Sequence, residues 1–378
     1  MRSRRWFVAS CVGAAVSGSI AAPLSALAQA AANPTPAGSP PPRPRIGKGT
    51  PTVALLLPRQ DGPFARAATA LMAGVAAAHA RDGADLVVEV IEVDDQADGL
   101  ALVFAELRER NFVLVIGPVT RNGATALVEL GSVGLPTLAL NLPEGDAPVP
   151  ARMAFMGLAT EPESRQAATQ AYAQSLERAG SRRPRAVAIV VASPLARRSL
   201  QAFRETGTGL GGELREVIEF AGPLPPRDLR ARLGSPPPDV AFLAMGAEQA
   251  RVLRVALGEK TAVWSTSLAS IGNTALLRLP ELDGMRLLEM PWQVEPEHPA
   301  VLSYAKAPVG FNVEMQRLYA LGIDAFRVGR QLLGGDAPFE LNGVTGRLRY
   351  DPQVSPRIER QAVVAVYRNG IPVALPSQ

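Results

Sequence analysis

Short apolar runs alternate with longer segments of helical spacing from Thr52 onward, and this alternation is the main structural signal in the chain. Apolar runs of about four to eight residues bounded by turn residues are typical of buried parallel strands. In the first part of the chain these runs are Val53–Leu57, Leu86–Val93, Val113–Ile116 and Thr137–Leu140. The segments between them that have helical spacing are Phe64–Ala80, Leu100–Glu109 and Asn122–Leu130.

The same pattern begins again near Glu161. The second set of predicted helices is Glu161–Ala179, Pro194–Glu205, Asp228–Leu233 and Glu248–Leu257. The second set of predicted strands is Ala186–Val191, Leu214–Phe220, Asp239–Met245 and Val263–Ser265. Repeated strand–helix units predict parallel sheets covered by helices, so we expect an α/β fold of two lobes. The longest predicted helix, Asn312–Leu333, follows both sets and ends at a glycine pair.

The N-terminal residues have the features of an export signal. Arg2, Arg4 and Arg5 precede an apolar stretch of small residues, and Ala28-Gln29-Ala30 fits a leader-peptidase site. We therefore predict a cleaved signal peptide at residues 1–30 and a periplasmic protein. A transmembrane anchor is the alternative, although glycines, serines and Pro23 interrupt the stretch. Residues 31–50 are rich in proline and small residues and predict a flexible linker.

Cys11 is the single cysteine of the chain. The run Val8-Ala9-Ser10-Cys11 weakly resembles a lipidation site, which would attach the protein to a membrane, but few apolar residues precede it. Cleavage after Ala30 would leave no cysteine in the mature protein. A disulfide, a thiolate metal site and a cysteine nucleophile would then be excluded.

The net positive charge of the chain comes from its N-terminal segment. Of the formal net charge of +4, the first 50 residues contribute +6, which leaves −2 for residues 51–378. A body this close to neutral gives no reason to expect nucleic-acid binding.

Signals for catalysis or cofactor binding are weak. His79 and His298 lie far apart without a zinc-protease motif around either, so no metal is expected. Gly207-x-Gly209-x-x-Gly212 follows a predicted helix rather than a strand, which favours a loop over a dinucleotide site. No phosphate-binding loop or serine nucleophile motif is present, so we expect no catalytic residues, no cofactor and no enzyme activity.

Loops at the carboxyl ends of parallel strands usually form the binding cleft of an open α/β sheet. In the first lobe these loops are Pro58–Phe64, Gly117–Gly123 and Asn141–Gly145. They make Thr120, Asn122 and Asn141 candidate ligand-binding residues. The alternative is that these side chains only cap helices and turns.

The second lobe adds further candidates for the same cleft. Ser193, Thr266 and Ser267 follow predicted strands, and Trp292 lies in an apolar Met-Pro-Trp segment. We expect Trp292 to line the hinge or a partner surface, with packing in the core as the alternative.

Four segments near the C-terminus resemble the LppC family of penicillin-binding-protein activators, in the domain of that family that is similar to binding proteins. They are MRLLEMPW (Met285–Trp292), LYALGIDAFRVGRQLLGG (Leu318–Gly335), GVTGRLRYDP (Gly343–Pro352) and VYRNGIPV (Val366–Val373). An earlier segment, Glu92–Pro118, resembles the leucine-type solute-binding proteins of ABC transporters.

Both resemblances imply the periplasmic binding protein type I fold, in which two lobes are joined by a hinge of three crossovers. They imply crossovers near Leu158–Thr160, Thr266–Gly272 and Arg349–Pro352. On this basis lobe 1 is predicted to comprise residues 51–158 and 270–350, and lobe 2 residues 159–269 and 351–378.

The two resemblances imply different functions. The first implies a regulator that activates a bifunctional peptidoglycan synthase, a penicillin-binding protein. The second implies a solute-binding protein that delivers a small amino acid or another carboxylate to an ABC permease. The Tyr-Gly pair that such solute-binding proteins commonly carry is replaced here by Ser193-Pro194-Leu195-Ala196. This difference is an argument against the solute-binding function.

Overall fold

The computed structural model describes residues 42–179, 183–222, 225–272, 277–335 and 337–376. The predicted signal peptide, Cys11 and the first part of the predicted linker lie outside these residues. No helix of the described part is long and apolar enough to span a membrane.

A first sheet of six strands, as far as the chain is described, has the order β1-β3-β2-β4-β5-β6. All neighbouring strands are parallel except β1, which is antiparallel to β3. The strands are β1 (Arg45–Ile46), β2 (Val53–Leu57), β3 (Val88–Glu92), β4 (Leu114–Ile116), β5 (Thr137–Ala139) and β6 (Met153–Phe155).

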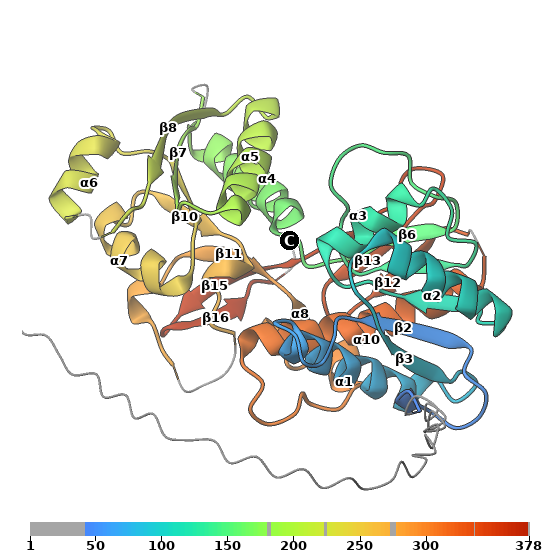
Figure 1. Ribbon diagram of the computed structural model, residues 1–378. Helices are drawn as coiled ribbons and strands as arrows, with labels where there is room; N and C mark the ends of the chain where they lie inside the picture. Colours follow the sequence, from blue (N-terminus) through green and yellow to red (C-terminus); the bar gives the residue numbers. More distant parts are fainter. Residues whose placement is uncertain (1–41, 180–182, 223–224, 273–276, 336, 377–378) are drawn as a thin grey trace, which may run out of the picture. The chain divides into compact units, whose positions relative to one another are not determined.

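Helices cover both faces of this sheet (Figure 1). They are α1 (Ala65–Asp82), α2 (Ala97–Glu109), α3 (Arg121–Glu129) and α10 (Val313–Leu333). Because side chains alternate along a strand, Val53 and Leu55 of β2 pack in the apolar cluster that contains α1 and α10. Ala54 and Leu56 pack in the cluster that contains α2 and α3.

A second sheet of seven strands within the described residues has the order β16-β15-β11-β10-β9-β7-β8. Its strands are β7 (Arg185–Val190), β8 (Glu213–Glu219), β9 (Val240–Ala244), β10 (Ala262–Ser265), β11 (Arg286–Glu289), β15 (Val363–Arg368) and β16 (Ile371–Ala374). Strands β7 to β11 are parallel, and β15 and β16 extend them as an antiparallel pair. The flanking helices are α4 (Thr160–Ala179), α5 (Pro194–Gly209), α6 (Pro226–Leu233) and α7 (Ala247–Leu257).

A small antiparallel sheet completes the fold. Its strands are β12 (Phe339–Asn342), β13 (Arg347–Tyr350) and β14 (Glu359–Gln361). Leu348 and Tyr350 belong to the same apolar cluster as α10, so this sheet extends the core of the first sheet. The short helices are α8 (Pro291–Val294), α9 (Pro299–Leu302), η1 (Ser267–Ala269) and η2 (Pro280–Leu282). The predicted α/β fold with parallel sheets flanked by helices is confirmed.

The predicted linker at residues 31–50 was extended too far into the chain. Arg45 and Ile46 form the edge strand β1, which pairs with Glu89 and Val88 of β3. Arg43 Nη1 also contacts Glu106 Oε1 at 2.5 Å. This strand has no recognisable sequence pattern because it is two residues long and lies in a proline-rich segment.

Two of the three predicted crossovers lie at other positions in the structure. The residues that we assigned to each lobe from these crossovers change accordingly. Strand β11 pairs with β10 and β15 in the second sheet, so residues 270–350 do not all accompany the first sheet. Strand β14 pairs with β13, so the last crossover lies between β14 and β15 rather than at Arg349–Pro352. The hydrophobic pattern shows where a strand lies but does not show which strand it pairs with. The division into two lobes that move about a hinge stays a prediction.

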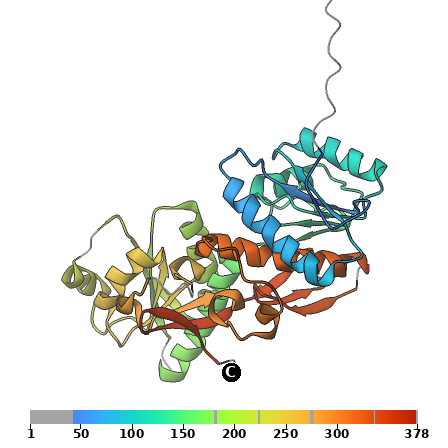
Figure 2. The same ribbon diagram turned by 90° about the horizontal axis from the view of Figure 1, so that it is seen from below.

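Helices α1 and α10 approach each other closely through two glycines, and Figures 1 and 2 both show these helices side by side. A Cβ atom added at Gly322 would lie 2.2 Å from the carbonyl oxygen of Leu71, and one added at Gly74 would lie 2.0 Å from that of Tyr319. Backbone atoms occupy both positions, so a side chain at either glycine would force the helices apart.

We predict that Gly322→Ala lowers the free energy of unfolding by about 1–3 kcal/mol, because overpacking of a core has a cost of this size. Urea denaturation measures the change. The matched control is Gly209→Ala in α5, where nothing lies within 4 Å of the added Cβ atom. The control should be neutral or stabilising by up to about 1 kcal/mol, because alanine favours helix. Equal stability of Gly322→Ala and the unaltered protein would contradict the close approach.

Candidate functional site

Thr120 and Asn141 lie after β4 and β5, at the carboxyl ends of the strands where the sequence placed them. Thr120 Oγ1 accepts a hydrogen bond from Gly123 N at 3.0 Å, which caps α3, and donates one to Asp95 Oδ1 at 2.5 Å. Asn141 Nδ2 donates to Val119 O at 3.1 Å, and its Oδ1 accepts from the next backbone N–H at 3.0 Å. Both side chains therefore hold the local loop structure.

Asn122 and Ser193 also lie in first turns of helices. Asn122 is exposed in α3, and its side chain has no hydrogen bond within the described residues. Ser193 caps α5, since its Oγ accepts from Ala196 N at 3.1 Å. Among these candidates, Asn122 is the one whose polar atoms remain available.

Thr266 and Ser267 follow β10. Thr266 is fully buried and its Oγ1 accepts from Leu268 N at 3.4 Å. Ser267 donates from its backbone N at 2.9 Å and from its Oγ at 2.7 Å to Glu163 Oε2. Ser267 therefore joins the second sheet to the first turn of α4.

Trp292 is half-buried in α8 and packs against the core of the first sheet. Its ring lies 5.2 Å from the ring of Tyr319 in α10, measured between centroids. This contact agrees with the alternative of core packing that the sequence left open.

The seven predicted residues are not brought together in the cavity that forms beside them. This cavity has a volume of about 600 Å³, and none of the seven lines it. Its wall nevertheless includes their neighbours, namely Arg121 of the Gly117–Gly123 loop and Leu142 and Pro143 of the Asn141–Gly145 loop. Two of the three predicted loops of the first lobe therefore border this cavity, but none of the predicted side chains lines it.

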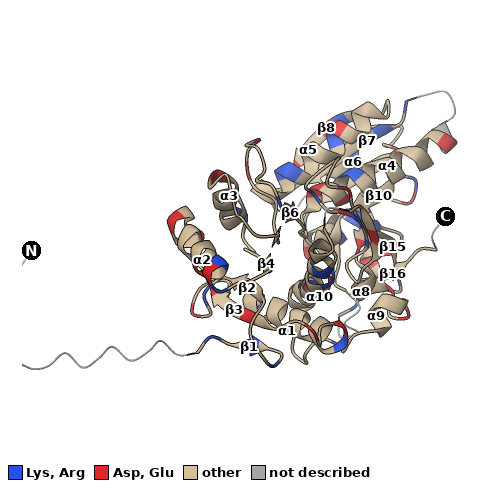
Figure 3. Cartoon of the chain, turned by 90° about the vertical axis from the view of Figure 1, so that its right-hand side faces the viewer, with Lys and Arg blue, Asp and Glu red and all other residues tan. Residues whose placement is uncertain are grey.

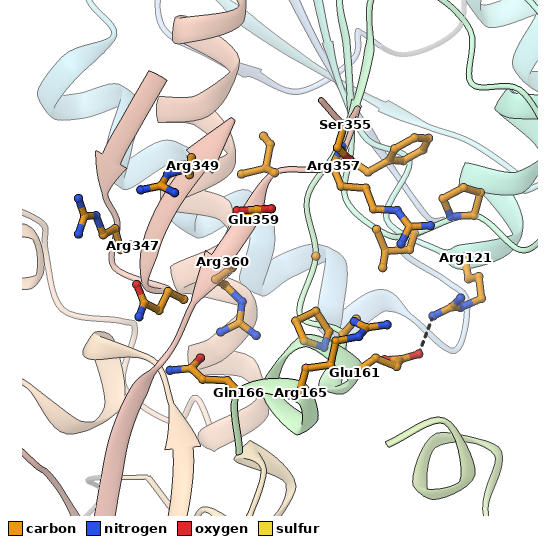
Figure 4. A pocket seen from close by; sticks show the side chains of 18 residues that line it. Arg121, Glu161, Arg165, Gln166, Arg347, Arg349, Ser355, Arg357, Glu359 and Arg360 are labelled. Carbon is orange, nitrogen blue, oxygen red and sulfur yellow. Dashed lines mark hydrogen bonds and ion pairs between the residues drawn. The ribbon is translucent and has the colours of Figure 1, made fainter. Parts of the chain in front are cut away.

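Six arginines and two glutamates line this cavity, which we call the arginine pocket (Figure 4). They are Arg121, Arg165, Arg347, Arg349, Arg357 and Arg360, with Glu161 and Glu359. Elsewhere in the described chain, basic and acidic residues are both scattered over the elements around the two sheets (Figure 3). The pocket is therefore a local excess of positive charge on a body that is close to neutral.

The six arginines differ in how well they are neutralised. Arg347 and Arg349 share the exposed Glu340, with nitrogen–oxygen distances of 2.6 and 2.7 Å. Arg360 is almost fully buried, and its Nη2 contacts Glu163 Oε1 at 2.7 Å.

The other three arginines are held more loosely. Arg121 lies 3.8 Å from Glu161 Oε1, which is beyond hydrogen-bond distance. Arg165 and Arg357 are exposed and have no side-chain partner among the described residues.

The pocket also has an apolar wall. Phe155 and Ile358 are buried and form part of its lining, and Leu142, Pro143 and Pro162 complete the apolar surface. A cavity that combines apolar walls with a few charged groups is the usual form of a small-molecule site.

A buried ionic network lies between the two large sheets. Arg317 of α10 contacts Glu289 Oε2 of β11 through Nη2 at 2.6 Å, and the same Nη2 donates to Ser267 O at 2.8 Å. Ser267 donates to Glu163, and Glu163 accepts from Arg360. The network formed by Glu163, Ser267, Glu289, Arg317 and Arg360 thus connects α10, β11, η1, α4 and β14.

The charge state of Arg317 is fixed by this network. Burial lowers the pKa of Arg317, but the charge and hydrogen bonds of Glu289, together with Glu314 and Glu163, outweigh burial and raise its pKa above the ordinary value. Arg317 therefore stays cationic at every pH at which the protein is folded.

The six arginines of the pocket are suited to binding anions. Guanidinium groups remain protonated in proteins, so they donate hydrogen bonds but do not act as general bases. Among the residues that the structure describes, no group of three His, Cys, Asp or Glu side chains lies where it could hold one metal ion. His79 instead contacts Leu86 O at 2.7 Å, and His298 caps α9.

Sequence reasoning missed the arginine pocket, although one signal was present. Arg347 and Arg349 are separated by one residue on a strand, which places both side chains on one face of the small sheet. Arg121 and Arg165 come from distant segments, and only the folded chain brings them near Arg357.

We predict that Arg317→Met lowers the free energy of unfolding by about 3–5 kcal/mol, because it leaves the carboxylate of Glu289 buried without its cation. Chemical denaturation at neutral pH measures the loss. The control is Arg330→Met on the same helix, where the ion pair with Asp85 is partly exposed and contributes about 1 kcal/mol or less. Similar losses for both variants would show that the buried network does not support the fold.

Comparison with known proteins adds to this geometry. A solved structure from Chromobacterium violaceum, described as "a putative branched-chain amino acid ABC transporter", is 30% identical, with a TM-score of 0.69, and the match covers 83% of this chain and 99% of that one. The LpoA (YraM) C-domain from Haemophilus influenzae, described as a regulator of PBP1A, is 19% identical, with a TM-score of 0.68, and the match covers 85% of this chain and 99% of that one. Both have the fold of the present chain.

A curated relative, the penicillin-binding protein activator LpoA of Enterobacter sp. (strain 638), is 26% identical over 324 residues. The match covers 72% of this chain and 42% of the relative, so the chain spans less than half of that protein. The sequence profile of the family described as "LppC putative lipoprotein" matches residues 48–229 and 239–370. The chain belongs to the LppC family.

Proposed function

We propose, with this family membership as the premise, that the chain is a periplasmic regulator that activates a bifunctional peptidoglycan synthase and is not itself an enzyme. The family match over residues 48–229 and 239–370 carries this proposal. The relative from Enterobacter supports it, since that protein is described as a penicillin-binding protein activator.

The part of the activators that this chain resembles is their C-terminal domain. The chain matches nearly the whole of the Haemophilus influenzae C-domain but 42% of the Enterobacter protein. We therefore propose that residues 43–378 provide the contact with the synthase. The Arg-rich N-terminus and the Ala28-Gln29-Ala30 site support export to the periplasm and release after cleavage. Lipidation at Cys11 is the alternative, since cleavage after Ala30 would remove that cysteine.

We predict that purified residues 43–378 bind a bifunctional penicillin-binding protein from the same cell and raise its rate of glycan polymerisation. Surface-immobilised synthase and a lipid-linked disaccharide substrate provide the two measurements. A solute-binding protein of the same fold but from outside the LppC family is the matched control, and it should leave the rate unchanged. Stimulation by both proteins, or by neither, would refute the proposed partner.

A second candidate function is that of a solute-binding protein for an amino acid or another small carboxylate, which would act with an ABC permease. The observation that favours it is the 30% identity to the Chromobacterium violaceum structure over nearly all of that chain. In this case the ligand would lie between the two lobes, near Thr120, Asn122, Asn141, Ser193 and Thr266. Thr120 and Ser193 already accept capping hydrogen bonds, which leaves Asn122 as the freest polar side chain.

This candidate predicts that one amino acid or small carboxylate raises the melting temperature of residues 43–378. A ligand present at about 100 times its Kd stabilises the folded state by roughly 2.7 kcal/mol. Asn122→Ala should abolish the shift without unfolding the protein, because this side chain is exposed. The control Thr169→Ala in α4 removes an exposed hydroxyl that bonds the Arg165 carbonyl, and it should keep the shift. The absence of a shift with every member of such a ligand set would exclude this function.

A further inference from the structure

The arginine pocket contains cations whose charge the described chain does not neutralise. Arg165 and Arg357 have no side-chain partner among the described residues, and Arg121 is 3.8 Å from its nearest carboxylate oxygen. Figure 4 shows these three side chains extending into the pocket from three different segments. Arg121 forms a long ion pair with Glu161, which is also paired with Arg198. The guanidinium groups of Arg165 and Arg357 have no such partner among the described residues, and a bound anion would compensate their charge.

The remaining arginines of the pocket already have carboxylate partners. Arg360 is engaged by Glu163, and Arg347 and Arg349 share Glu340. The excess charge is therefore concentrated at the end of the pocket formed by α3, the start of α4 and the segment before β14.

The size and the wall of the pocket indicate the class of ligand. A volume of about 600 Å³ is far more than a single inorganic ion needs and is typical of sites for small organic molecules. Phe155 and Ile358 offer apolar contact on one side, while the guanidinium groups offer paired donors that match carboxylate or phosphate oxygens.

We propose that the arginine pocket is a binding site for a small organic anion that carries two or more carboxylate or phosphate groups. Arg165 and Arg357 bind the anionic groups by charge-assisted hydrogen bonds, and Arg121 provides the third cation. This site goes beyond the contact with the synthase and does not depend on it. It is also separate from the predicted cleft residues, because none of them lines the pocket.

Isothermal titration calorimetry of residues 43–378 with citrate and with pyrophosphate tests this proposal. Sodium chloride keeps the ionic strength equal in all samples, because surface charge interactions are screened by salt. Binding of citrate alone identifies a carboxylate site, binding of pyrophosphate alone identifies a phosphate site, and binding of both identifies a site that recognises the charge. No heat of binding with either probe would overturn the proposal.

The variant Arg165→Gln/Arg357→Gln should weaken binding by about a hundredfold, since it removes two charge-assisted contacts and each contributes roughly one order of magnitude. The matched control is Arg197→Gln/Arg204→Gln in α5, which removes two exposed arginines that have no side-chain partner in the described chain and line no part of the pocket. The control should bind as the unaltered protein does. Equal affinity of both double variants would show that the anion is held by general surface charge and would overturn the assignment. Far-ultraviolet circular dichroism of each variant confirms that it is folded.

Discussion

The buried ion pair between Arg317 and Glu289 is the contact on which the arrangement of the two large sheets depends. Arg317 belongs to α10, which covers the first sheet, and Glu289 ends β11 of the second sheet. Both side chains are almost completely buried, so each charge has lost most of its hydration. Such a pair is tolerated only when the remaining polar atoms are satisfied, and here Ser267 O, Glu314 and the backbone N–H of Met290 supply the other contacts. Removal of Arg317 leaves the buried Glu289 without its cation, whereas removal of Glu289 leaves Arg317 paired with Glu314 alone. Arg317 is therefore the residue on which the connection between the two sheets depends.

This constraint explains why some polar residues at the strand ends are not free to bind ligands. Ser267 was a plausible ligand contact from its position after a strand, yet its N–H, Oγ and carbonyl oxygen all belong to the buried network. The network continues through Arg360, whose Nη1 donates to Thr345 O, and Thr345 in turn donates to Asp324 of α10 from its N and Oγ1. Polar groups near the junction of the sheets therefore hold the structure, and groups available for a ligand lie further out, in the arginine pocket.

The sequence predicted the alternation of strands and helices well because buried apolar residues recur with a regular spacing in each segment. The helix α10 was predicted within one residue, since both its apolar face and its glycine terminus are local signals. Pairing and packing are not local. The position of β11 depends on hydrogen bonds to β10 and β15, and the edge strand β1 depends on contacts with β3. The motif Gly207-x-Gly209-x-x-Gly212 gave no hint of its role, which is to leave space for Tyr172, because a Cβ atom at Gly207 or Gly212 would lie within 2.4 Å of that ring.

The sequence indicated two of the loops that border the arginine pocket, but it did not indicate the arginine side chains that line it. Arginine supplies 36 of the 39 basic residues, so the sequence does not distinguish an arginine that stabilises the fold from one that binds a partner. The structure separates them by their neighbours. A buried guanidinium such as Arg317 or Arg360 requires a carboxylate, because an unpaired buried charge is costly. An exposed guanidinium such as Arg357 does not, and its charge remains available to another molecule. In this chain the buried arginines Arg317 and Arg360 are paired and hold the structure, whereas Arg165 and Arg357 are unpaired among the described residues and line the arginine pocket.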